Sequence, residues 1–309
     1  MGDWLEPGLR FLHYALLLGL FGWTAFRVIG LRALDWQQQP ESWMAEAISA
    51  AVLAPLVSIM LMLTSIATMM GQPLAALEGP MIEAMVFGTD LGWAFLLRVA
   101  LLGAALLALS LRNRLSLALP FAALCYAAAL ITLAWTGHAA ATEGGWGLFH
   151  RLNDGLHLLA GGLWLGAIGW FLHLVIRAHR RAESTQARTL LGVMHGFAPL
   201  GIALVSVVAV TGLINAQMIF GITNSVSVLT TDYGILLAVK LVLVGGMLAF
   251  AAHNARIGRR EALPDESQAS DSSASLVALR RSLVGEFGLA IGVVGLVAVL
   301  GMMSPMVME

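Results

Sequence analysis

Charged side chains are scarce in this 309-residue chain, and that scarcity excludes a soluble globular protein. Asp, Glu, Lys and Arg together make up 11% of the residues, whereas hydrophobic residues make up 59%. Because a soluble domain carries roughly 25% charged residues, this chain has too few polar side chains to cover a surface in water. The formal net charge of −1 also excludes a polybasic nucleic-acid-binding protein.

Cysteine and the common catalytic motifs are missing as well. The one cysteine, Cys125, excludes an internal disulfide framework and a Cys-x-x-Cys metal or redox site. The chain has no phosphate-binding loop, nucleophile elbow or His-Glu-x-x-His motif. We therefore expect no enzymatic activity and no ATP-driven transport by this chain alone. The side chains left for binding a metal are mainly 15 methionines and 8 histidines.

Long apolar runs dominate what is present. A helix needs about 20 apolar residues to cross the hydrocarbon core of a bilayer. Eight stretches qualify, at approximately 9–31, 44–71, 90–111, 115–136, 148–177, 197–221, 233–254 and 283–304. Runs of this length indicate helices, because every backbone polar group in lipid must be paired within its own segment. The sequence thus predicts an all-α, polytopic membrane protein with eight transmembrane helices.

The basic residues predict the orientation. Thirteen of the seventeen Lys and Arg residues fall in or beside the loops that follow the first, third, fifth and seventh apolar runs. The loops on the other side, 72–89, 137–147 and 222–231, contain neither residue type. By the positive-inside rule the basic loops are cytoplasmic. Both termini then face outward, into the periplasm if the cell is Gram-negative.

Short sequence matches predict an internal repeat. Thr89-Asp90-Leu91-Gly92 and Thr231-Asp232-Tyr233-Gly234 each precede a basic residue, Arg98 or Lys240, that lies nine positions after the threonine. His13 and Gly22 match His157 and Gly166 at a similar offset. Four helices per unit indicate a parallel repeat. We expect one half at 1–140 and the other at 141–309, with a cytoplasmic linker at 256–282.

Polar side chains gather at the outer end of the fifth apolar run. Spacings of four and three residues place His150, Asp154 and His157 on one helical face. His138 lies in the loop just before them, and the repeat places His13 at the same depth. Imidazole and carboxylate groups can bind a divalent cation together. The predicted metal site is therefore His13, His138, His150, Asp154 and His157, although water and headgroups could also satisfy these groups at the membrane interface.

Methionines show the same bias toward the outer side. Thioethers are soft ligands that suit Cu(I), although a single methionine in a membrane helix more often fills space. The candidate soft ligands at or beyond the outer helix ends are Met69, Met70, Met81, Met85, Met218, Met302, Met303 and Met306.

Other polar residues lie deeper in the predicted spans. Arg98 and Lys240 need acidic partners or a polar interior, with Asn215 and Asn254 as candidate members of the same polar pathway. Snorkelling of Lys240 and helix-to-helix hydrogen bonds of the asparagines are the structural alternatives. His173 and His253 could instead ligate a haem near the inner face, as histidine pairs do in membrane cytochromes.

The second half of the chain resembles the CopD family of bacterial copper-resistance inner-membrane proteins. The resemblance rests on His138, 150–166, 211–216, 231–234, Lys240 and Asn254, and on His13 in the first half. It implies an eight-helix protein that handles copper at the inner membrane, often beside a small periplasmic copper carrier of the CopC type.

Three hypotheses follow. In the first, the protein accepts periplasmic copper, as Cu(I) or Cu(II), and mediates its transport or homeostasis in copper resistance or uptake. In the second, it is a haem-binding redox protein with bis-His ligation. In the third, it docks a periplasmic copper carrier without transporting copper.

Overall fold

The computed structural model describes residues 4–30, 44–181, 184–261 and 272–305, and every regular element in these ranges is a helix. Eight of the helices are long and apolar enough to cross a membrane. They are α1 (Leu5–Ile29), α2 (Met44–Met69), α4 (Asp90–Ser110), α5 (Ala118–Ile131) with the 3-10 turn η3 (Thr132–Trp135), α6 (Gly144–Arg181), α7 (Ser184–Ile219), α9 (Asp232–Glu261) and α10 (Ser272–Leu300). Among the described residues, the prediction of an all-helical chain is confirmed, and so is the number of helices long and apolar enough to span a membrane.

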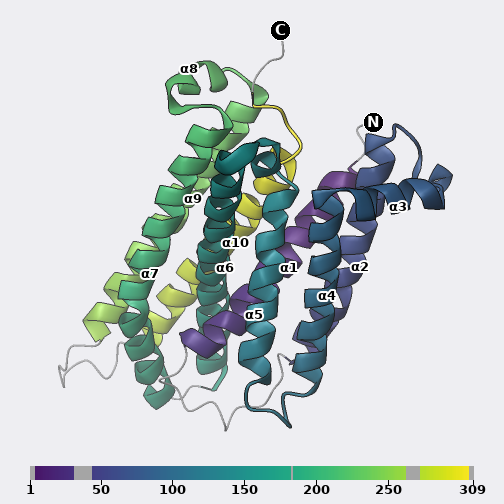
Figure 1. Cartoon of the computed structure of the whole chain (residues 1–309). Coiled ribbons are helices and arrows are strands. Elements are labelled where there is room, and N and C mark those ends of the chain that lie inside the picture. The colour runs from purple at the N-terminus through teal and green to yellow at the C-terminus, as the bar shows by residue number, and fades with distance from the viewer. Residues whose placement is uncertain (1–3, 31–43, 182–183, 262–271, 306–309) are drawn as a thin grey trace.

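Five short elements lie in the outer connections. They are η2 (Leu74–Ala76), α3 (Gly79–Gly88), η4 (His138–Ala141), η5 (Ile222–Asn224) and α8 (Ser225–Val228). Figure 1 shows α3 and α8 at the same end of the bundle, where α1 also begins and α10 ends. We call this the α3–α8 end. The α3 helix was not expected, because ten residues are too short for an apolar run to be recognised as a span.

The helices extend further toward the opposite end than hydropathy indicated. Helix α7 begins at Ser184 rather than near 197, and α10 begins at Ser272 rather than near 283. The added turns contain many polar residues, so an apolar window misses them although the helices continue. Of the predicted linker 256–282, residues 256–261 belong to α9 and 272–282 to α10, whereas 262–271 lie outside the described residues.

Helices α1 and α6 form the central pair of the bundle. A Cβ atom at Gly22 would lie 2.9 Å from the Cα atom of Gly166 and would overlap the carbonyl oxygen of Gly162. Glycine at these positions therefore lets the two backbones touch, as small residues do in membrane helix pairs. Toward the opposite end, Trp170 stacks on Trp23 with ring centroids 4.2 Å apart and donates its indole N–H to the carbonyl oxygen of Trp23 at 2.7 Å.

The remaining contacts follow a matching scheme in the two halves. Helix α1 packs against α2 and α5, and α6 packs against α7 and α10. Helix α4 packs against α2 and α5, and α9 packs against α7 and α10. Each of the four pairings in the first half thus has a counterpart in the second.

Helices α4 and α9 also begin in the same way. The hydroxyl of Thr89 accepts the backbone N–H of Gly92 at 3.0 Å, and that of Thr231 accepts the N–H of Gly234 at 3.1 Å. These are N-caps, which satisfy a backbone donor that the first helical turn leaves unpaired. A Cβ at either glycine would overlap a carbonyl of the preceding segment, Val86 or Val228. This explains the Thr-Asp-x-Gly pattern at both positions.

Candidate functional site

The N-terminal end of α6 is shaped by a tight turn. Gly144 has φ +65°, a left-handed conformation that favours glycine, and the turn carries Thr142 back toward the first turns of α6. The ring nitrogen Nδ1 of His150 lies 2.8 Å from the Thr142 hydroxyl oxygen. His150 is buried, with 1% of its surface exposed, so the turn holds this imidazole within the α3–α8 end rather than in the surrounding lipid.

His138 lies above this turn in η4, which packs against α6 and α7. Its Nε2 is 3.0 Å from the backbone carbonyl oxygen of Met303, beyond the end of α10, and its ring lies edge-on to Tyr233. His138 is within electrostatic range of His150 and Asp154. The structure therefore brings these three predicted site residues into one neighbourhood.

A hydrogen-bonded network joins α6 to α7 one turn further down. Asn215 donates to the carboxylate of Asp154 at 2.9 Å and accepts from Asn153 at 2.7 Å. Asn153 also donates to the backbone carbonyl of Thr211 at 2.9 Å. Lys240 on α9 is within electrostatic range of Asp154, so an acidic side chain lies near this cation.

The protonation of His157 follows from the hydrogen bonds of its neighbour. Its Nδ1 lies 2.9 Å from the hydroxyl oxygen of Thr211, and Thr211 donates its single hydroxyl hydrogen to the carbonyl oxygen of Val207. When Thr211 gives its hydrogen to that carbonyl, its oxygen accepts from His157 and the hydrogen of the neutral imidazole lies on Nδ1. In this tautomer Nε2 keeps its lone pair, as a metal-binding histidine requires.

His13 in the first half contacts a hydroxyl in the same way as His157 does. Its Nε2 lies 2.7 Å from the hydroxyl oxygen of Ser58 on α2, and Ser58 donates its own hydrogen to the carbonyl of Ala54. When Ser58 gives its hydrogen to that carbonyl, the hydrogen of His13 lies on Nε2 and Nδ1 keeps the lone pair.

Each half has a basic residue near one of its histidines. Arg98 is within electrostatic range of His13, and Lys240 is within electrostatic range of His157. Arg98 is buried and donates twice to Thr132, at 2.7 Å to the hydroxyl and at 3.1 Å to the backbone carbonyl. That carbonyl is available because α5 ends at Ile131 and continues as a 3-10 turn. Each half thus contains a histidine, a hydroxyl from the next helix and a basic residue.

The five predicted ligands do not form one site. Among the described residues, no group of three or more His, Cys, Asp or Glu side chains is placed to hold a metal ion. His13 turns toward α2 and His157 toward α7, so each imidazole faces the interior of its own half rather than the α1–α6 contact. The expectation that imidazoles from both halves meet around one ion is therefore not met in this structure, whereas a role of each residue in binding copper stays a prediction.

Comparison with known proteins identifies the family. The chain is 32% identical over 307 residues to copper resistance protein D of Pseudomonas syringae pv. tomato, covering 99% of this chain and 98% of that protein. It belongs to the copper resistance protein D family. Residues 1–148 match the model of the copper resistance protein D-like N-terminal domain, and residues 191–300 match that of copper resistance protein D.

A second relative is more distant. Inner membrane protein YebZ of Escherichia coli (strain K12) is 27% identical over 275 residues, which cover 85% of this chain and 87% of that protein. No solved structure matches the chain. Membership of the copper resistance protein D family agrees with a copper-related role and gives no support to the haem alternative.

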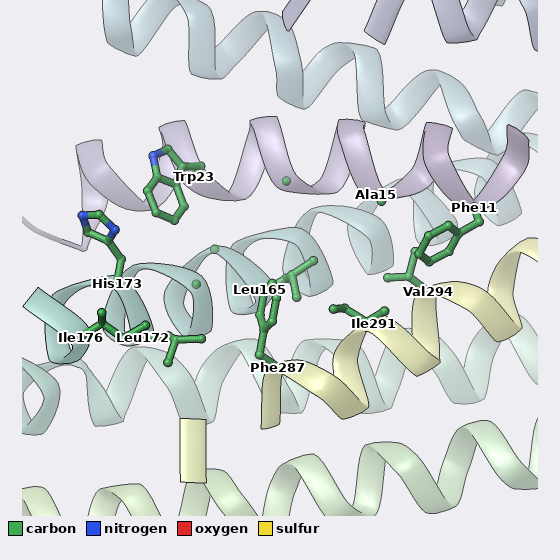
Figure 2. Close-up of a pocket in the computed structure, with 13 residues that line it drawn as sticks. Phe11, Ala15, Trp23, Leu165, Leu172, His173, Ile176, Phe287, Ile291 and Val294 are labelled. Atoms are coloured by element: carbon green, nitrogen blue, oxygen red, sulfur yellow. The ribbon is translucent and has the colours of Figure 1, made fainter. Parts of the chain in front are cut away.

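The two histidines considered for haem lie in different pockets. His173 lines a pocket of about 380 Å³ between α1, α6 and α10. Figure 2 shows it beside Trp23 at one end of this pocket, with apolar side chains such as Leu165 and Ile291 along the rest. His253 lines another pocket, between α9 and α10. The structure therefore does not bring this pair together.

The described candidate methionines fall into two groups. Met69, Met70, Met81 and Met85 lie on α2 and α3, whereas Met218 lies on α7 and Met302 and Met303 follow α10. Met85 and Met303 pack against separate hydrophobic clusters, so these thioethers do not line one funnel. Met306 lies outside the described residues, and metal binding by any of them stays a prediction.

Several polar residues of the site were not predicted. The hydroxyls of Ser58, Thr142 and Thr211 hold His13, His150 and His157. Thr211 belongs to the 211–216 match with the CopD family, but Ser58 and Thr142 gave no signal, because serine and threonine are ordinary in membrane proteins. Glu286, bonded to Asn254 at 2.9 Å, did carry one. It is an acidic residue inside the last apolar run, and an ionisable residue inside a membrane span is a functional candidate.

Proposed function

We propose that this protein binds copper at the α3–α8 end of its helix bundle and mediates copper transport across the inner (plasma) membrane, as part of copper resistance or uptake. One observation carries the proposal: the whole chain is similar to a protein named for copper resistance. Fixed imidazoles inside the helix bundle support it, because imidazole suits copper in both oxidation states. The activity is then binding and transfer rather than catalysis.

His157 and His13 are the proposed ligands inside the two halves. In each, one ring nitrogen is held by a hydroxyl and the other keeps its lone pair. A hydrogen bond to the non-ligating nitrogen fixes the tautomer and the ring orientation of metal-binding histidines. His138, His150 and Asp154 would receive the ion first, since they lie at the mouth of the second half.

Few ligands at each position suit a protein that passes copper on. A site with an incomplete coordination shell can accept an ion while the donor still holds it, and a small periplasmic carrier of the CopC type would be such a donor. The paired cations Arg98 and Lys240 would shape the polar interior without binding the ion, because like charges repel.

Uptake of copper into proteoliposomes tests transport directly. We expect vesicles containing the wild-type protein to accumulate copper, supplied as Cu(I) or as Cu(II), above the level of protein-free vesicles. The His150→Ala/His157→Ala variant should reduce the uptake to that level. Copper that binds to the protein but never enters the lumen would contradict transport and would favour docking of a copper carrier without transport.

We also infer that the two halves are a parallel repeat, with both termini on the periplasmic side. Matching helix contacts, the equivalent caps at Thr89 and Thr231, and contact between the equivalent glycines Gly22 and Gly166 support the repeat. The absence of Lys and Arg from loops 72–89, 137–147 and 222–231 supports the orientation.

Cysteine labelling tests this orientation. In a Cys125→Ser background, Ser227→Cys at the α3–α8 end should react with a membrane-impermeant maleimide added to spheroplasts. Ser110→Cys, exposed at the opposite end of α4, should react only after the membrane is permeabilised. The reverse pattern would show that both termini are cytoplasmic.

A further inference from the structure

Glu286 is a buried acid deep in the second half of the bundle. It lies on α10, within the membrane-spanning segment Ser275–Leu300, and 2% of its surface is exposed. An acidic side chain at this depth is costly when charged unless a cation or a proton neutralises it. Neither the proposed copper ligands nor the network around Asp154 includes this residue.

The partners of Glu286 come from two neighbouring helices and are all neutral. Asn254 on α9 donates to one carboxylate oxygen at 2.9 Å, and the indole N–H of Trp164 on α6 lies close to the carboxyl group. The described part of the chain provides no basic partner for this carboxyl group. Two neutral donors leave one negative charge unneutralised.

Two more oxygen atoms in the same place lack a partner. The Oδ1 atom of Asn254 and the hydroxyl oxygen of Ser282 are buried and have no hydrogen-bond partner among the described residues. Ser282 precedes Glu286 by one helical turn on α10, so both lie on the same face. Buried polar atoms are rarely left unpaired. The cluster Glu286, Asn254 and Ser282 therefore has more acceptor oxygens than hydrogens to fill them.

A pocket reaches Ser282, at the edge of this cluster. It has a volume of about 660 Å³, lies between α9 and α10, and is lined by Ser282 together with His253 and Arg281, both exposed. The helices packed against α10 also carry other titratable or charged side chains. They include Arg256 on α9, His157 and His173 on α6, Tyr14 and Arg27 on α1, and His195 on α7.

We propose that the Glu286 carboxyl is a proton-binding site, which takes up and releases a proton through Ser282 and the pocket beside His253. In the proton-bound form Glu286 is a neutral carboxylic acid, and its O–H group donates a hydrogen bond to a buried acceptor oxygen of the cluster. On release the O–H bond breaks, the electron pair stays on the carboxylate, and the proton passes to water in the pocket. This inference does not depend on copper binding.

The chemistry of the cluster favours a proton over a metal ion. Copper prefers nitrogen or sulfur ligands, and the cluster presents oxygen. Calcium and magnesium need about six or more oxygen ligands, whereas a proton needs one carboxylate oxygen and a nearby acceptor.

Infrared spectroscopy and carbodiimide labelling of the full-length protein in detergent test the proposal. At neutral pH the wild-type spectrum should contain the carbonyl band of a protonated carboxylic acid that is shielded from water, and Glu286→Gln should lose this band completely. A hydrophobic carbodiimide, which reacts with protonated carboxyl groups, should label Glu286 in the wild type, and the labelling should fall as the pH is raised.

Glu83→Gln is the matched control, because Glu83 is exposed on α3 and its replacement should leave the band intact. The labelling experiment uses the wild-type chain, so it gives a result even if Glu286→Gln fails to fold. An unlabelled Glu286, or a band that Glu286→Gln retains, would overturn the assignment. Labelling that sodium ions suppress at constant pH would also overturn it, because the site would then hold a metal cation.

Discussion

Replacing His150 and His157 together by alanine is expected to strip the protein of copper. The variant lacks the His157 imidazole, whose ring is held by Thr211 and whose Nε2 is the proposed copper ligand. It also lacks the His150 imidazole at the mouth of the second half. Changing only the hydrogen-bond partner of a metal ligand costs about 10–100-fold in affinity, so losing two ligands should exceed that range. Metal analysis of the purified proteins after equilibration with copper measures the effect.

Graded variants separate ligand loss from misfolding. Thr211→Val keeps the shape of the side chain but removes the acceptor for His157, and should weaken copper binding by about 10–100-fold, whereas Thr211→Ser should preserve it. His179→Ala is the control, because His179 is exposed near the end of α6. Unchanged copper content in the double variant would remove the proposed site. An intense Soret band in the absorption spectrum of the wild type would restore the haem hypothesis.

Replacing Gly22 by alanine should destabilise the bundle, because the added methyl group falls in the backbone contact between α1 and α6. The new Cβ would overlap the Gly162 carbonyl oxygen and approach the Gly166 Cα to 2.9 Å. Both neighbours are backbone atoms, so no side chain can rotate away and α1 must separate from α6. Forcing extra atoms into a packed interior costs about 1–3 kcal/mol, and close backbone contact is a main source of attraction between membrane helices. Thermal unfolding in detergent measures the loss.

Gly19→Ala is the matched control, three residues away on the same helix. A Cβ at Gly19 would meet no atom within 4 Å, and alanine favours a helix over glycine by roughly 0.5–1 kcal/mol. This variant should unfold at the wild-type temperature or above it. Equal stability of the two variants would show that contact between α1 and α6 does not hold the halves together.

The sequence was sufficient for the number of spans and for the places where polar groups occur. In lipid, the backbone polar groups of a run of about 20 apolar residues can be paired within the run only if it forms a helix. The eight apolar runs therefore predicted eight spans. The Thr-Asp-x-Gly pattern likewise predicted where α4 and α9 begin, because capping and close packing are local requirements. His138, His150 and Asp154 share a neighbourhood because they are close in sequence, and α6 places them at the same mouth.

The partners of the buried groups were decided by tertiary structure. In lipid the outer face of a helix is as apolar as its packed face, so periodicity does not show which way a helix is turned. Rotation of α1 and α6 directs His13 to Ser58 and His157 to Thr211, instead of toward each other. The rotation of α10 about its own axis likewise places Glu286 beside Asn254 and Trp164. Apolar composition therefore determined that the chain crosses a membrane. Only the packing of helix against helix determined which nitrogen lone pairs of His13 and His157, and which charge on Glu286, remain for a ligand.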